Sequence, residues 1–122
     1  MSKAVGENVS KYAVKFHKRN LNYIEDQLFY NVTFLRLQQD FLNELLKMRG
    51  HVFLNEAYDA IGVKRTSSGA IVGWRDTQVR DDLPYYPQSP DSGDNQIVFH
   101  IIQEDNYLVV DFNVEGIIYN KI

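Results

Sequence analysis

The sequence predicts an α+β domain, with one long and one short helix packed on a small antiparallel sheet that includes a C-terminal hairpin. Two observations carry the prediction: apolar residues recur with helical spacing over 25–49, and two apolar runs, 96–102 and 107–112, flank a polar turn. A chain of 122 residues can build one hydrophobic core but not two. We therefore expect a single domain over 1–122.

The first expected element is a strand over 11–18, where apolar and mostly basic residues alternate. This alternation gives the strand one basic face, which makes the strongest local charge excess in the chain. Such a face can contact an acidic partner or nucleic acid. The simpler interpretation is a solvated edge, on which Lys discourages aggregation. If a partner binds here, Lys15 and Lys18 are the residues expected to meet it.

The strongest helical pattern covers 25–49. Two acidic residues at its start and two basic residues at its end suit the helix dipole, and Gly50 suits a left-handed cap. The spacing places two rows of apolar residues on one face, Leu28, Leu35 and Leu42 in the first and Phe34, Phe41 and Met48 in the second.

The remaining elements are shorter. A second helix is expected over 51–61, ended by Gly62, and the two helices are then joined at Gly50. Residues 66–69 have turn composition, and 70–74 fit either a short strand or one helical turn. The stretch 75–95 holds all three prolines and is expected to be irregular. After the hairpin, 117–119 form a plausible third strand.

Composition excludes several classes of function. A net charge of −3 argues against nucleic-acid binding, which needs an excess of Lys and Arg. Without cysteine there are no disulfides and no Cys-ligated zinc. No apolar run approaches the ~18 residues of a membrane helix, and the N-terminus lacks the apolar segment of a signal peptide. We expect a cytoplasmic chain with no membrane contact.

Catalytic signals are weak. His51, Asn55 and Asp59 are four residues apart and would share a helix face, but a single His and an Asn make a poor metal site. A solvated face explains them more simply. The enzyme hypothesis would need a polar pocket near His51, Glu56 and Asp59. No phosphate-binding loop or nucleophile elbow is present, so we expect no catalytic residues, no metal and no cofactor.

The stretch 75–95 is the most suggestive surface feature. Tyr85 and Tyr86 lie between prolines, which favour extended backbone, and Tyr is a common interface residue. The two rings either contact a partner or fold back over the core, and the sequence does not decide between these. With Arg75 and Arg80 of the same stretch, they complete the set of expected partner-binding residues.

Three blocks of the chain stand out together: LNEAYDAIG within 49–62, SGAIVGW at 68–74 and VDFNVEGIIY at 110–119. They resemble the corresponding blocks of a group of uncharacterised phage and prophage proteins. The chain departs from the group between Trp74 and Gln96, where the similar proteins tend to carry a Gly-Asp turn and a strand. The blocks suit a scaffold role, in which Leu54, Tyr58 and Ile61 bury a helix face, Gly62 and Gly73 permit tight backbone, and Trp74 fills the core.

The resemblance implies a phage origin and no particular activity. We expect a phage structural or assembly protein of the head, neck or tail, acting through contacts with other phage proteins or with copies of itself. The alternative is a soluble effector that binds and inhibits a host or defence protein. The chain would then act in the virion or in the host cytoplasm.

Overall fold

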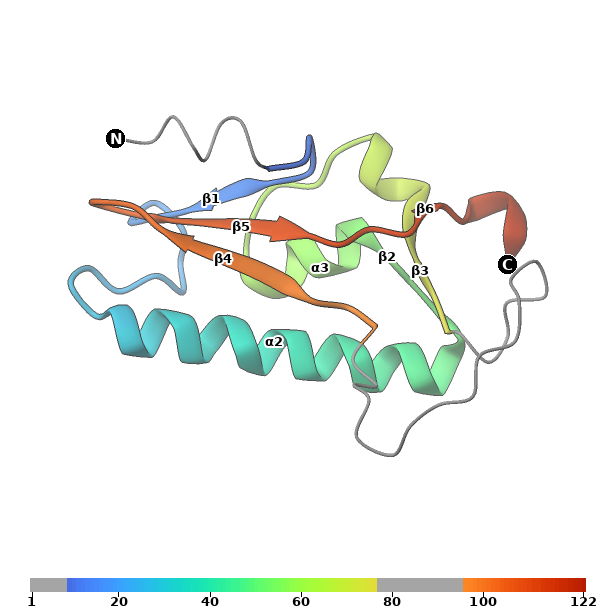
Figure 1. The fold of residues 1–122 in the computed structure, drawn as a ribbon, viewed down its shortest axis with the longest axis horizontal. Helices are drawn as coiled ribbons and strands as arrows, with labels where there is room; N and C mark the ends of the chain where they lie inside the picture. The colour runs from blue at the N-terminus through green and yellow to red at the C-terminus, as the bar shows by residue number, and fades with distance from the viewer. Residues whose placement is uncertain (1–8, 77–95) are drawn as a thin grey trace.

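A computed structural model describes residues 9–76 and 96–122 (Figure 1). In these ranges the fold has a long helix, α2 (Leu28–Arg49), and a short one, α3 (Leu54–Ile61). The α+β class is confirmed, but the strands form two three-stranded antiparallel sheets rather than one. The first sheet has the order β1–β5–β4 and the second β2–β3–β6. None of these helices is long and apolar enough to cross a membrane.

The first sheet consists of β1 (Val14–Phe16), β4 (Phe99–Gln103) and β5 (Leu108–Phe112). The predicted hairpin is confirmed, since β4 and β5 pair from Phe99 opposite Phe112 to Gln103 opposite Leu108. β1 adds to the other edge of β5, so the first and last parts of the chain lie in one sheet. It is shorter than the predicted strand over 11–18.

The second sheet consists of β2 (His51–Phe53), β3 (Val72–Arg75) and β6 (Gly116–Ile117). The strand alternative for 70–74 is thus confirmed, with a 3₁₀ turn, η1 (Ser68–Ala70), before it. The third predicted strand occurs one residue early and pairs with β3 rather than with the hairpin. A second 3₁₀ turn, η3 (Tyr119–Lys121), follows it.

The predicted start of the second helix is wrong. Residues His51–Phe53 form strand β2, which pairs with β3, and the central residue Val52 is fully buried. This pairing depends on Gly73, because a Cβ at that position would overlap the carbonyl oxygen of Val52. α3 therefore begins at Leu54, and His51 does not share a helix face with Asp59.

The long helix also begins later than predicted. Asp26 has a positive φ of 63°, and α2 starts two residues after it, so neither Glu25 nor Asp26 lies in its first turn. The predicted end is confirmed: Gly50 has a φ of 90° and its N–H donates to the Leu46 carbonyl at 2.8 Å. Gly62 ends α3 with the same left-handed conformation.

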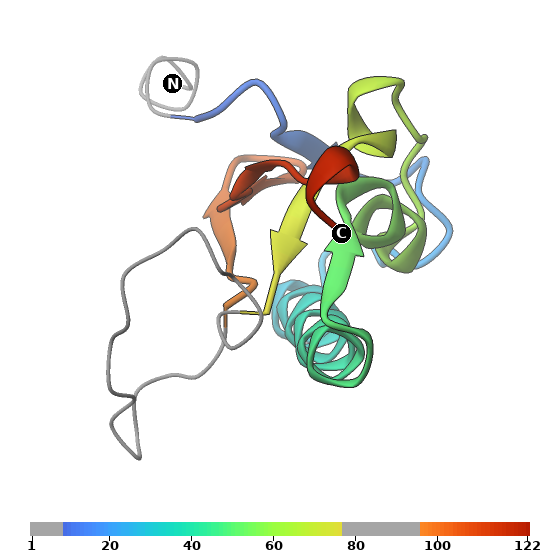
Figure 2. The same ribbon diagram turned by 90° about the vertical axis from the view of Figure 1, so that its right-hand side faces the viewer.

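The core lies between α2, the two sheets and α3. Seen along α2, both sheets and α3 lie over the same side of this helix (Figure 2). Phe112 contacts the rings of Phe99 and Tyr58, with centroids 5.0 and 5.6 Å apart. Trp74 is 1% exposed, and the predicted burial of Leu54, Tyr58 and Ile61 is confirmed.

Candidate functional site

Side-chain amides of α2 hold the backbone that leads into β4. Asn43 accepts from the N–H groups of Gln96 and Ile97 at 3.1 and 3.0 Å and donates to the Ile97 carbonyl at 2.9 Å. Gln39 accepts from the Phe99 N–H at 2.8 Å. These buried amides replace a neighbouring strand along this edge, so they fix which side of α2 faces the core.

The core-facing side of α2 differs from the predicted one. Leu35 and Leu42 of the first apolar row are fully buried, and polar Asn31, Gln39 and Asn43 complete the buried face. Asn31 is satisfied by two hydrogen bonds to the backbone of Ile24. In the second row, predicted to share this face, Phe41 and Met48 are rotated toward solvent, whereas Phe34 is partly buried and packs on the core.

The rotation leaves an apolar surface that the described residues do not cover. We call it the outer stripe. Its four members are Tyr30 (43% exposed), Leu37 (59%), Phe41 (56%) and Met48 (76%). Their spacings of seven, four and seven place them on one line along the helix. Phe34 and Leu45 are partly buried and pack on the core.

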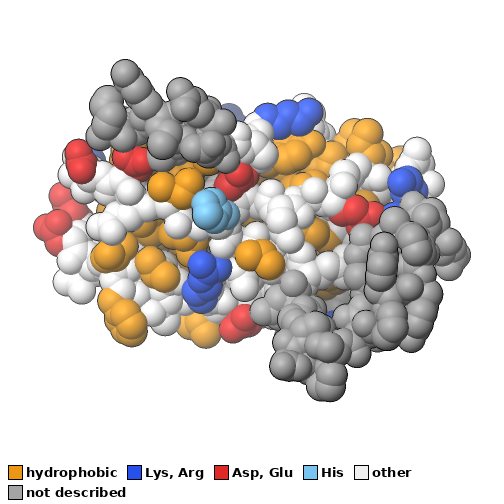
Figure 3. All heavy atoms as spheres, viewed as in Figure 1, with side chains coloured by type: hydrophobic (Ala, Val, Ile, Leu, Met, Phe, Trp, Pro, Cys, Tyr) orange, Lys and Arg blue, Asp and Glu red, His pale blue; other side chains and the backbone are white. Residues whose placement is uncertain are grey.

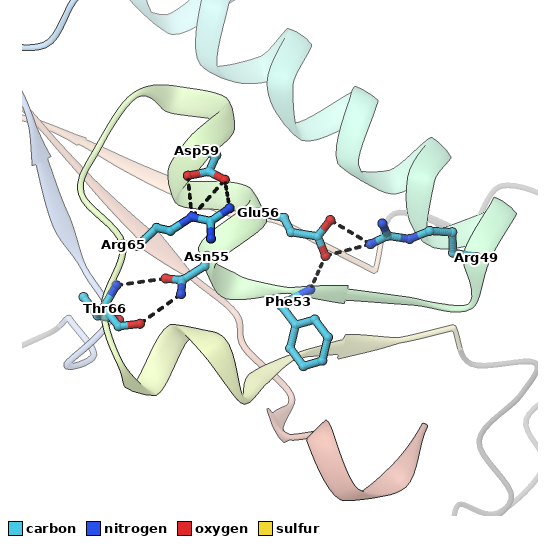
Figure 4. Close-up of polar contacts among 7 residues, drawn as sticks. All are labelled: Arg49, Phe53, Asn55, Glu56, Asp59, Arg65 and Thr66. Atoms are coloured by element: carbon cyan, nitrogen blue, oxygen red, sulfur yellow. Dashed lines mark hydrogen bonds and ion pairs between the residues drawn. The ribbon is translucent and has the colours of Figure 1, made fainter.

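The acidic side chains of α3 form ion pairs that stabilise the fold. Glu56 accepts from the Phe53 N–H at 3.0 Å and pairs with Arg49 at 2.6 Å. Asp59 pairs with Arg65 at 2.5 Å, and hydrogen bonding from this guanidinium lowers the pKa of the Asp59 carboxyl. Figure 4 shows the two pairs on different sides of α3. The structure therefore does not bring Glu56 and Asp59 together in one pocket.

No group of three side chains that could hold a metal ion occurs within 9–76 and 96–122. His51 lies in β2, while Asn55 donates to the Thr66 carbonyl at 2.9 Å and accepts from the Thr66 N–H at 2.9 Å. Both the nitrogen and the oxygen of the Asn55 amide thus bind Thr66 and fix the loop after α3 (Figure 4). The helix face considered for metal binding is therefore not formed.

The predicted partner-binding residues fall into three groups. Tyr85, Tyr86 and Arg80 lie outside the described residues. Arg75 is 5% exposed, and its guanidinium donates to the Glu115 carboxylate at 2.5 and 2.9 Å. Buried in this way, Arg75 joins β3 to the segment before β6 rather than presenting a surface charge.

Lys15 and Lys18 line an open cavity of about 810 Å³ between the β1–α2 connection and the β4–β5 turn. The Lys15 ammonium lies 4.9 Å from the centre of the Tyr107 ring. Glu104 and Asp105 line the same cavity, and acidic side chains gather at this end of the molecule (Figure 3). Because the walls carry both signs of charge, their electrostatics selects neither an anion nor a cation.

Comparison with known proteins places the chain in a family. The model of a family of unknown function, DUF6353, matches residues 2–122. The chain belongs to the DUF6353 family. No curated protein and no solved structure matches it.

In this DUF6353 member, the three sequence blocks contact one another through side chains. Asn55 of the first block lies where a Cβ on Gly69 of the second would collide with it. The Trp74 indole N–H donates to the carbonyl and side-chain oxygens of Asn113, in the third block, at 3.0 and 3.1 Å. These contacts support the scaffold interpretation of the blocks.

Sequence reasoning missed the outer stripe because it assigned Phe41 and Met48 to the core-facing rows and gave Tyr30 and Leu37 no role. Two features of the sequence could have revealed it. The apolar residues of α2 cover a broad part of its circumference, and three amide side chains recur along the helix at Asn31, Gln39 and Asn43. A single core-facing stripe does not need residues so far round the helix. An excess of this kind indicates a second apolar surface.

Proposed function

We propose that this DUF6353 member is a structural or assembly component of a phage particle, in the head, neck or tail, and that it acts through protein contacts. The outer stripe is the observation that carries the proposal. A row of four large apolar side chains along an exposed helix is costly in water and becomes favourable when a partner covers it.

The size of the stripe suits a contact surface. At about 200 Å² for a large side chain, the exposed fractions amount to roughly 450 Å² of apolar surface. Burying this area stabilises a complex by about 11 kcal/mol at ~25 cal/mol per Å². The cost of association is about 4–15 kcal/mol, so the stripe can support a large part of a specific interface.

Two further points support a contact role in a phage particle. The three sequence blocks resemble those of phage and prophage proteins, which favours a phage origin and action in the virion or the host cytoplasm. The acidic residues of α3 are engaged in ion pairs that hold the fold, so they do not form a reactive pocket on this helix.

Proteomics of purified particles tests the proposal. We expect the chain in particles at a stoichiometry shared with other structural proteins. The double variant Leu37→Ser, Phe41→Ser should fold and yet be lost from particles. The matched control is Ile117→Ser, which changes an apolar residue of similar exposure, 53%, on β6.

Absence of the wild-type chain from purified particles would contradict the proposal. If, in addition, a pull-down from host lysate captured a single host or defence protein, the effector hypothesis would take its place. If the wild type is present, retention of the double variant in particles would show that the outer stripe is not the contact.

A further inference from the structure

We propose that the outer stripe packs against the same stripe of a second copy, so that two α2 helices pair in antiparallel orientation. This inference rests on the proposed contact role and names the partner. The stripe and its neighbours follow a seven-residue repeat, as in helices that pair along a seam. One position of the repeat holds Tyr30, Leu37 and Glu44, and the other holds Phe34, Phe41 and Met48.

The charge of Glu44 selects the orientation. In a parallel pair each residue of the seam faces its own copy, so two Glu44 carboxylates would meet among apolar side chains. In an antiparallel pair centred at residue 39, Leu37 faces Phe41 of the second copy. Glu44 then faces Phe34 of the second copy, and its carboxylate can reach water at the edge of the interface.

The same register is self-complementary, as a two-fold interface requires. Centring at residue 39 also brings Tyr30 against Met48 of the second copy, so both ends of the stripe are covered. The distance from Tyr30 to Met48 along the helix is about 27 Å. A partner helix of equal length covers this line, whereas a small or flat partner would leave part of it exposed.

The area is adequate for a small dimer. A standard interface buries about 800 Å² per partner, and the four stripe residues supply roughly 450 Å² of it. The flanking surface of α2, including the partly buried Phe34 and Leu45, supplies more. The core-facing residues Leu42 and Leu46 point about 120–160° away from the stripe, so the two sheet layers lie outside the helix pair and do not obstruct it.

The position of Asp40 provides a further test of the proposed register. It is exposed beside the stripe, next to the two-fold axis of the antiparallel pair. The two Asp40 carboxylates would therefore approach each other and weaken the dimer. Asp40→Asn removes this repulsion, so we expect the variant to dimerise more tightly than the wild type.

Analytical ultracentrifugation over a dilution series measures the association. We expect a reversible dimer for the full wild-type chain. The double variant Leu37→Ser, Phe41→Ser should dissociate about 100-fold more readily, because each change truncates a central contact. Ile117→Ser should match the wild type, and circular dichroism should show that all three chains are folded.

Single cysteines then report the orientation without background, since the chain has no cysteine of its own. With a short bifunctional maleimide, Asp40→Cys should give a covalent dimer, because position 40 lies beside its own copy. Met48→Cys should not, because the two copies of position 48 lie at opposite ends of an antiparallel pair. Coupling through Met48→Cys alone would overturn the proposed orientation.

A wild-type chain that stays monomeric at all concentrations would overturn the inference. Particle proteomics keeps this result distinct from the proposed function. A monomer that is still found in particles would leave the contact role in place and assign the stripe to another protein. A dimer that is absent from particles would support the pairing and contradict the particle role.

Discussion

Replacing Asn43 by alanine tests the idea that buried amides join α2 to the hairpin. The Asn43 side chain is 5% exposed and serves both the N–H and the carbonyl of Ile97, a residue with no exposed surface. Alanine leaves these two backbone groups buried without a partner, at about 1–3 kcal/mol each. The better helix propensity of alanine returns about 0.5 kcal/mol.

The expected net loss is therefore about 3 kcal/mol in the free energy of unfolding, or a fall of about 10 °C in Tm for a chain of this length. Urea denaturation measures the first quantity, and a thermal melt measures the second. Hydrogen exchange should show that the Ile97 amide loses its protection. Gln38→Ala is the matched control on α2, because Gln38 makes no side-chain hydrogen bond to the described residues.

A loss below 1 kcal/mol with the Ile97 amide still protected would refute this reasoning. It would mean that water, or a shift of the segment before β4, satisfies both backbone groups. The amides of α2 would then be tolerated at the interface and would not hold it.

Three other predictions concern single positions. Gly73→Ala should destabilise the protein by about 1–3 kcal/mol in urea denaturation, because its Cβ overlaps the backbone of β2; an unchanged midpoint would contradict the close packing of β2 on β3. Tyr58→Phe should cost about 1 kcal/mol, since the phenol donates to the Tyr12 carbonyl at 2.8 Å. Burial, with the nearby Tyr12 and Asp111 charges, raises the pKa of Tyr58 from 10.0 to about 12. The free energy of unfolding of the wild type should therefore fall between pH 10 and pH 12, and Tyr58→Phe should flatten this fall. Because the pKa of Asp59 is lowered, its ion pair with Arg65 stabilises the fold above pH 3.8, and this stabilisation is lost as the pH falls further. The urea midpoints of the wild type and Asp59→Asn should therefore converge at low pH.

Local signals in the sequence were sufficient for much of the fold. Gly50 and Gly62 end their helices because each adopts a left-handed backbone conformation that glycine accepts readily. The hairpin follows from two apolar runs around a polar turn, which is also a local pattern. The class and the helix ends could therefore be predicted without knowledge of distant contacts.

The errors arose where distant residues decide the structure. Residues 51–53 fit a helical period, but their pairing with β3 depends on Gly73, 20 or more positions later in the chain. The orientation of α2 depends on Asn43 bonding to a backbone 54 residues away. Periodicity alone does not report such partners, so Phe41 and Met48 of the outer stripe were assigned to the core.

The asparagine and glutamine contacts have a consequence for the conditions the protein can withstand. Amides carry no charge, so added salt does not screen their hydrogen bonds as it screens an exposed ion pair. The bonds from Gln39 and Asn43 to the strand edge, and those between Trp74 and Asn113, are of this neutral kind. The charged Arg36 guanidinium adds hydrogen bonds to Gln39 and to the Phe99 carbonyl at the same joint. The packing of the helix on its hairpin should therefore persist from dilute buffer to molar salt.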